Sequence, residues 1–241
     1  MVTQWIQTVA FVIVAAMIGT LLYWQVDLIH RGGPVMIPIV MCSVFAVAVI
    51  GERFYYFFQL HLGKDIGHFF TRLREAVERR QWNDAKTLCD SWQGPVARVA
   101  RAGIEAREGT SQEIDEAMEE TAHEEMPVVE RHLRWLSTLA QVSTLLGLLG
   151  TVTGLVRAFQ VIQAKSGSSG NPVSPGDLAG GVWEALITTV AGLIIAIPTI
   201  LAYNYFAARG AEVQFHMEKA ADIVAGWRRG RTPHAPTPMN P

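Results

Sequence analysis

One acidic residue lies in surroundings that could give it a chemical role. Glu184 lies within residues 178–208, a stretch with no other ionisable side chain apart from tyrosines. A lone charge at the centre of a membrane costs on the order of 2.5–3.5 kcal/mol, so such residues usually face a partner or a water-filled path. A glutamate near the outer interface could instead reach water directly, and a run of this length leaves its depth open. We favour a functional role for Glu184, as a carboxyl group that exchanges protons.

Hydroxyl groups and glycines surround this carboxyl group at helical spacing. Thr188 follows Glu184 by four residues and shares its helical face, whereas Thr189 is turned toward a flank. Small residues in the two apolar runs permit close helix approach, and hydroxyls stand among them. These are Gly147, Gly150, Gly154 and Gly192, with Thr151 and Thr153. Membrane threonines often bond to carbonyls of their own helix, and that alternative stays open for each of them. Pro198 is expected to kink the last apolar run by removing one helical hydrogen bond.

Signatures of other functional classes fail on inspection. The sequence has no zinc-protease, phosphate-loop, nucleophile-elbow or paired-cysteine motif, so it does not look like an enzyme. The seven histidines are scattered, which makes a metal site improbable, and no residue pattern implies a cofactor. A net charge of −2 provides no basic face for nucleic acid. Cys42 and Cys89 are expected to be small packing residues.

Four uncharged runs predict an all-α, polytopic membrane protein. They comprise residues 1–26, 32–51, 135–156 and 185–208. Each has about the 20 residues that a helix needs to cross a bilayer. The run around residues 5–24 is either a retained extra span or a cleaved signal, and we favour a span because aromatic residues mark both its ends.

Charge distribution predicts the topology. Residues 52–134 hold 12 of the 20 Lys plus Arg, and the tail 209–231 holds five more. Because basic residues stay on the cytoplasmic side, we expect both segments and the N-terminus on the cytoplasmic side of the membrane. We expect an N-terminal span and outer connection at residues 1–31, a second span at 32–58 and a cytoplasmic helical domain at 59–134. A transmembrane hairpin is expected at 135–207, with an outer loop at 164–177, and a cytoplasmic tail at 208–241.

The cytoplasmic region reads as helix throughout. Phe69, Leu73 and Val77 form one apolar stripe. We expect breaks at residues 93–95 and 108–111, the latter ending in an N-cap. The acidic run 113–130 is interpreted as a solvated helix face. Without a visible break before Trp135, one long helix is expected to continue from the cytoplasm into the membrane.

Three blocks of the two last apolar runs resemble the ExbB/TolQ family of proton-channel subunits. They read GLLGTVTG at 147–154, EALITTVAG at 184–192, and AIPT at 196–199 followed by Tyr203 and Asn204. Residues 32–38, Glu52 with Arg53, and 94–98 also resemble ExbB, so the likeness covers roughly residues 32–207. This sequence departs from the family pattern at Thr144, Thr153 and Thr188, and at Arg157, which we expect to extend outward. It also departs in its additional N-terminal span, because the family pattern has three spans.

The resemblance implies a homopentamer around two copies of a single-span ExbD/TolR-like partner, embedded among membrane lipids. It also implies a role for TonB- or TolA-like proteins, and use of proton flow for work at the outer membrane. The family's membrane glutamate corresponds to Glu184, and its two pore-lining threonines correspond to Thr151 and Thr189. The leading hypothesis is therefore a proton-channel subunit that drives TonB-dependent transport. A TolQ-like subunit for envelope integrity, a motility stator and a non-conducting membrane scaffold remain alternatives.

Overall fold

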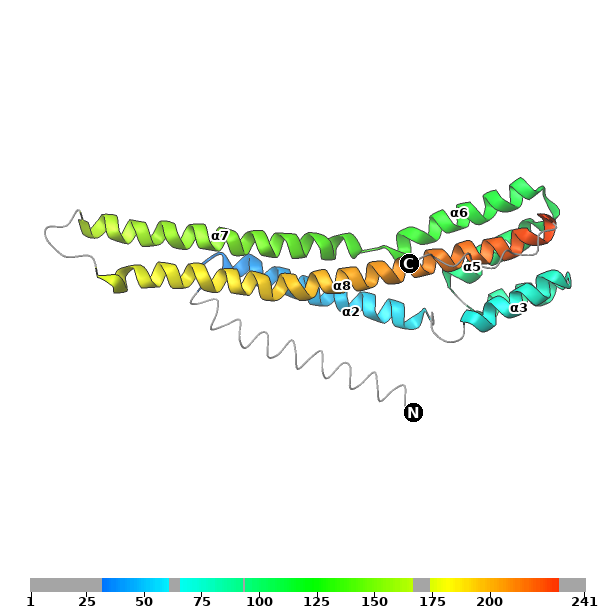
Figure 1. Cartoon of the computed structure of the whole chain (residues 1–241), viewed down its shortest axis with the longest axis horizontal. Helices are drawn as coiled ribbons and strands as arrows, with labels where there is room; N and C mark the ends of the chain where they lie inside the picture. The colour runs from blue at the N-terminus through cyan, green and yellow to red at the C-terminus, as the bar shows by residue number, and fades with distance from the viewer. Residues whose placement is uncertain (1–31, 61–65, 93, 167–173, 230–241) are drawn as a thin grey trace, which may run out of the picture. The chain divides into compact units, whose positions relative to one another are not determined.

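The computed structural model describes residues 32–60, 66–92, 94–166 and 174–229, and these contain helices and no strand. The expected span at residues 5–24 lies outside the described residues. The elements are shown in Figure 1. They are α2 (Met36–Gln59), α3 (Ile66–Glu78), α4 (Trp82–Trp92), α5 (Pro95–Glu105), the short 3-10 helix η1 (Ala106–Glu108), α6 (Ser111–Val129), α7 (Leu133–Ser166) and α8 (Pro175–Arg229).

Three helical stretches of the described chain are long and apolar enough to cross a membrane. They are Met36–Gln59, Ser111–Lys165 and Leu178–Trp227. The first is α2, the second contains α6 and nearly all of α7, and the third contains most of α8. The all-α class and the family's three spans are thereby confirmed. The chain divides into two compact units: one contains Met1–Ile50 with Trp135–Ala202, and the other contains Gly51–Arg134 with Tyr203–Pro241. We refer to them as the membrane unit and the polar unit.

The membrane unit has a small interior and a large apolar exterior. Met36, Ile39 and Ala191 form its buried cluster. Many large apolar side chains of α7 and α8 are exposed in the single chain, among them Leu145, Leu148, Val152, Phe159, Leu186, Val190, Ile194 and Leu201. Apolar surface of this extent is covered by lipid tails or by other membrane chains.

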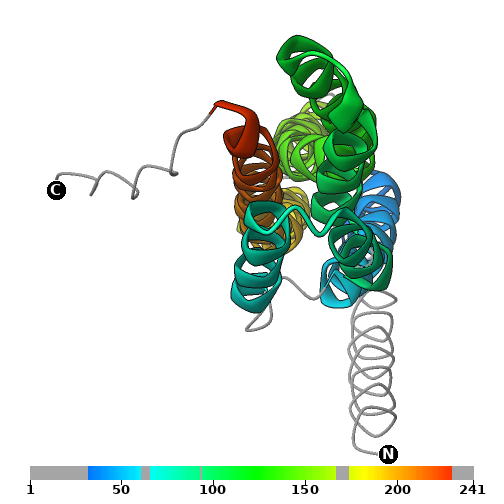
Figure 2. The same cartoon turned by 90° about the vertical axis from the view of Figure 1, so that its right-hand side faces the viewer.

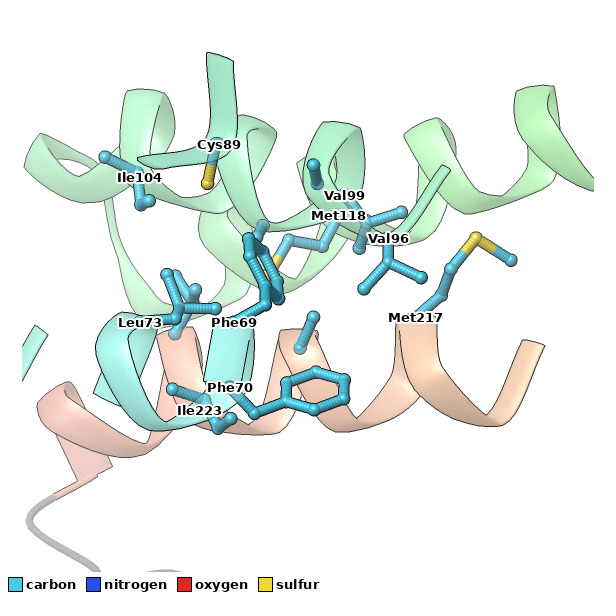
Figure 3. Close-up of a cluster of buried hydrophobic side chains, with 14 of the residues drawn as sticks. Phe69, Phe70, Leu73, Cys89, Val96, Val99, Ile104, Met118, Met217 and Ile223 are labelled. Carbon is cyan, nitrogen blue, oxygen red and sulfur yellow. The ribbon is translucent and has the colours of Figure 1, made fainter. Parts of the chain in front are cut away.

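The polar unit has the larger hydrophobic core. Phe69, Leu73 and Val77 are at most 2% exposed, which confirms the predicted stripe on α3. They pack with residues of α4, α5, α6 and the C-terminal part of α8, as Figure 3 shows. Figure 2 views the helices of this unit end-on. The core therefore joins segments that lie more than a hundred residues apart in the sequence.

The two predicted breaks coincide with helix starts. Gly94 has φ of 144°, and Pro95 follows at the first position of α5, where its missing N–H costs nothing. Thr110 is the N-cap of α6: its side-chain oxygen accepts a hydrogen bond of 3.2 Å from the Glu113 N–H, and the Glu113 carboxylate accepts from the Thr110 N–H. This capping box satisfies two backbone donors that would otherwise lack partners.

The expectation of one unbroken helix from residue 111 into the membrane is wrong. α6 ends at Val129, α7 begins at Leu133, and His132 adopts a positive φ of 64° between them. Buried Arg53 donates hydrogen bonds to the carbonyls of Val128 and Val129, at 3.2 and 3.3 Å. These carbonyls belong to the last turn of α6, where a cation complements the helix dipole.

Glu52 connects both sides of this break. One of its carboxylate oxygens lies 2.9 Å from Arg53 Nη2, and the other lies 2.6 Å from His132 Nδ1. The groups that stabilise the break therefore come from α2, about 80 residues earlier in the chain. Pro127 lies inside α6, two residues before its end, and removes one helical hydrogen bond there.

Cys89 is expected to resist alkylation while the polar unit is folded. It is 4% exposed, and burial raises the pKa of its thiol from 9.0 to about 12. Because only the thiolate reacts, iodoacetamide at pH 8.5 should modify Cys89 slowly in the native protein and quickly in denaturant. The measurement is mass spectrometry of a Cys42→Ser variant, in which Cys89 is the remaining cysteine. Native-state alkylation at the denatured rate would contradict it.

The same pKa shift has a stability consequence at alkaline pH. Below about pH 9 the thiol is neutral in both the folded and the unfolded chain, so it makes no pH-dependent contribution. Between about 9 and about 12 the unfolded chain loses this proton and the folded chain keeps it. Stability should therefore fall through this window, and fall less in a Cys89→Ala variant.

Candidate functional site

The membrane unit brings α7 and α8 into backbone contact through glycines, as the two helices running side by side in Figure 1 illustrate. A methyl group on Gly154 would lie 2.6 Å from the carbonyl oxygen of Gly181, and one on Gly181 would lie 2.6 Å from that of Gly154. A methyl group on Gly192 would lie 2.6 Å from the carbonyl oxygen of Ser143, and one on Gly147 would lie 3.3 Å from Cα of Thr189. No side chain fits at these positions without moving a helix.

Thr188 is fully buried at this contact and lies against Gly150. Its hydroxyl donates within α8, to the carbonyls of Glu184 and Ala185 at 3.0 and 2.9 Å. Gly32, before α2, also lies close to the Thr188 methyl group. The structure thus places Thr188 beside the backbone of Glu184, where α7, α8 and the turn before α2 meet.

Thr189 connects the two helices of the hairpin. Its hydroxyl lies 2.9 Å from the carbonyl oxygen of Gly147 on α7 and 3.3 Å from that of Ala185 on its own helix. The glycine leaves the carbonyl accessible, so the two helices share a direct polar contact. A hydrogen bond across apolar helices stabilises their association by up to about 1–2 kcal/mol.

The threonines of α7 bond within their own helix. The Thr151 hydroxyl donates to the Leu148 carbonyl at 2.6 Å, and the Thr153 hydroxyl lies 3.1 Å from the carbonyls of both Leu149 and Gly150. Both residues therefore bond to carbonyls of their own helix in the single chain, which is the alternative left open above for membrane threonines. Thr151 remains half-buried, so its hydroxyl can exchange this partner for another group.

Glu184 is paired with Arg157. One Glu184 carboxylate oxygen accepts a hydrogen bond from Arg157 Nη1, and the two side chains are 13% and 44% exposed, respectively. Gly33, which precedes α2 with φ of 66°, lies against both groups. The outward extension expected for Arg157 missed this partner. A carboxylate and nearby hydroxyls can hold and pass protons, and the guanidinium can position the carboxylate. The described residues contain no cluster suited to a metal ion.

Pro198 lies inside α8, which continues through it to Arg229. Its ring leaves the Ile194 carbonyl without the usual helical donor. The next residue, Thr199, is buried and donates its hydroxyl to the Ile195 carbonyl at 2.6 Å. The weakened backbone therefore lies about three to four turns beyond Glu184 on the same helix.

Comparison with known families places this geometry in context. The model of the MotA/TolQ/ExbB proton channel family matches residues 91–219, which include α7 and the part of α8 described above. The chain belongs to this family. The match covers more than half of the sequence and includes Glu184, Arg157 and the threonines Thr151, Thr153, Thr188 and Thr189.

Individual members of the MotA/TolQ/ExbB family resemble the chain over between about half and four fifths of its length. An ExbB-like biopolymer transport protein of Synechocystis is 32% identical over 178 residues, which cover 73% of this chain and 81% of that protein. Biopolymer transport protein exbB1 of Vibrio cholerae is 29% identical over 205 residues, or 82% and 86% of the two chains. The Tol-Pal system protein TolQ of Haemophilus influenzae is 33% identical over 113 residues, 47% of each.

The sequence interpretation missed the roles of three residues at this site. These are the pairing role of Arg157 and the packing roles of Gly33 and Gly181. A lone arginine and a lone glutamate in neighbouring apolar runs were a usable signal, since charges in membranes usually pair. Gly181 was less visible, because adjacent Gly180 has the same residue type and contacts nothing within 4 Å.

Proposed function

We propose that this chain is the proton-conducting subunit of an ExbB/ExbD-type complex that uses protonmotive force to drive TonB-dependent transport at the outer membrane. One observation carries the proposal. In the segment matched by the proton channel family, a single carboxyl group, that of Glu184, lies largely buried where three apolar helices meet. A membrane carboxyl group in such a place is a candidate proton carrier.

Each polar residue of the hairpin has a distinct part in this proposal. Glu184 accepts and releases the proton. Thr151, Thr188 and Thr189 line the path. Each hydroxyl can accept a hydrogen bond from a protonated group while it donates its own hydrogen bond to another. The glycines bring the helices close enough to exclude bulk water, with Gly147, Gly150, Gly154 and Gly192 providing the contact. Pro198 supplies a point at which α8 can bend.

The energy available is sufficient for a change in helix packing. A protonmotive force of about 150 mV supplies roughly 3.5 kcal per mole of charge, from ~2.3 kcal/mol per 100 mV. Proton transfer between Glu184 and a carboxylate on a partner helix would then let that helix turn or shift. In this proposal the ring of copies is the housing, and the partner exports the force.

The proposed assembly is a homopentamer around a single-span ExbD/TolR-like partner, in a bacterial inner membrane with the basic segments inside. The extensive exposed apolar surface of α2, α7 and α8 supports burial against lipid and further chains. The basic residues at 52–134 and in the tail support the cytoplasmic placement of those segments. The chain would act as a channel subunit rather than an enzyme.

A TolQ-like role in envelope integrity is the second candidate, and the resemblance to the Haemophilus protein favours it. The two candidates differ in the third protein: a TonB-like chain for transport or a TolA-like chain for the Tol-Pal system. Copurification of the native complex followed by mass spectrometry distinguishes them. Recovery of a TonB-like chain supports the first role, and recovery of a TolA-like chain supports the second.

The channel function itself is tested in proteoliposomes. We expect a potassium diffusion potential to drive proton uptake when this chain is reconstituted with its single-span partner, and little uptake with either alone. A pH-sensitive dye inside the vesicles measures the flux, and native mass spectrometry establishes that the complex is intact. An intact complex without flux under any potential would favour a non-conducting scaffold.

A further inference from the structure

Two opposite charges face each other in apolar parts of the hairpin. Arg157 directly follows the uncharged run 135–156, and Glu184 directly precedes the uncharged run 185–208. Nine residues separate Arg157 from the end of α7 at Ser166, and nine separate the start of α8 at Pro175 from Glu184. Equal distances from the connection bring both residues to the same level of an antiparallel hairpin.

In the part of the chain that the structure describes, the side chain paired with Glu184 is that of Arg157. Arg157 reaches Glu184 from α7. The backbone of Gly33, in the turn before α2, faces this pair. A methyl group on Gly33 would lie 2.8 Å from both Arg157 Nη1 and the Glu184 carboxyl carbon. The turn before α2 therefore lies directly against the ion pair, and the positive φ of Gly33, 66°, favours glycine at this position.

Protonation of Glu184 would upset this balance of charge. A guanidinium keeps its proton at every physiological pH. When Glu184 becomes neutral, Arg157 is left as an uncompensated cation in an apolar segment, which is costly. The cost is relieved only if the guanidinium finds another acceptor. Its exposed fraction of 44% in the single chain means that a group of a neighbouring chain can reach it.

We propose that Arg157 is a positioning residue for the proton step. It holds Glu184 as a carboxylate against the Gly33 turn, and it changes partner to a carboxylate of the single-span chain when Glu184 takes up a proton. The inference rests on the proposed function and adds the coupling element to it. Proton uptake and a change of contact between chains become one event, because the same guanidinium serves both carboxylates.

A stability cycle tests the pair independently of conduction. The thermal midpoints of the purified complex are compared for wild type, Glu184→Gln, Arg157→Gln and the double variant. Glu184→Gln should lower the midpoint most, since it strands a cation that cannot lose its charge. The double variant should recover most of that loss. Additive losses would overturn the proposal, because they would mean that the two side chains act separately.

A pH profile of proton flux tests the positioning role. Arg157→Lys keeps the charge and should keep the pH of half-maximal flux, whereas Arg157→Gln removes the cationic partner of Glu184 and should change that pH. Lys165→Gln, a loss of one basic charge from the last turn of the same helix, is the matched control and should not move it. An unchanged profile in Arg157→Gln would overturn the proposal. If wild type does not conduct, the proposed function fails, while the stability cycle still decides whether the pair is coupled.

Discussion

Replacing Glu184 with glutamine is expected to lower potential-driven proton flux by about a hundredfold or more while leaving the complex assembled. Glutamine has nearly the same shape as glutamate and cannot exchange a proton, and a positioned acid–base group typically contributes 10²–10⁴-fold to a proton transfer. Flux into proteoliposomes, normalised to the amount of intact complex, measures the effect.

Two further variants make this result interpretable. Glu184→Asp retains an ionisable group at a shorter reach and should retain part of the flux. Glu120→Gln removes an exposed carboxylate from α6 and should change nothing. Wild-type flux in an intact Glu184→Gln complex would contradict the acid–base role assigned to Glu184. Proton transfer would then be assigned to the partner's carboxylate.

Substituting alanine for Gly181 is expected to destabilise the hairpin by about 1–3 kcal/mol, the range for overpacking. The added methyl group would lie 2.6 Å from the Gly154 carbonyl oxygen and 2.9 Å from the Ala158 backbone nitrogen. These are backbone atoms of the opposing helix, so relief requires α7 and α8 to separate. The thermal midpoint of the purified protein in detergent measures the loss.

Gly180 provides a matched control one residue away. A methyl group there meets nothing within 4 Å, so Gly180→Ala should be neutral or slightly stabilising through the higher helix propensity of alanine. The two substitutions are chemically identical and differ only in what they contact. Equal effects of both on the thermal midpoint would mean that α7 and α8 do not pack through Gly154 and Gly181.

Features determined by local sequence were predictable. Three apolar runs became helices suited to a membrane, and the spacing of Phe69, Leu73 and Val77 identified the buried face of α3. Proline, glycine and threonine at residues 94–95 and 110 marked the helix starts. Each of these signals acts through residues within one or two helical turns, which is why the sequence alone contains them.

Features determined by contacts between distant segments were not predictable. The break between α6 and α7 depends on Arg53 and Glu52, and no residue beside His132 demands a positive φ. The opposite charges of Arg157 and Glu184 indicated that the two residues could pair, but whether they meet depends on the relative rotation of α7 and α8. Glycine spacing indicated that close packing would occur, but not which glycines would oppose each other, because a one-turn slip leaves the pattern unchanged.

Infrared difference spectroscopy of the reconstituted complex tests the central claim, that Glu184 takes up a proton within the membrane. The C=O stretch of a protonated carboxyl group is separate from that of a carboxylate, so acidification should produce such a band over the pH range in which flux is activated. The account predicts that Glu184→Gln loses one component of this band while any component from the partner's carboxylate persists. An identical difference spectrum in wild type and Glu184→Gln would contradict it.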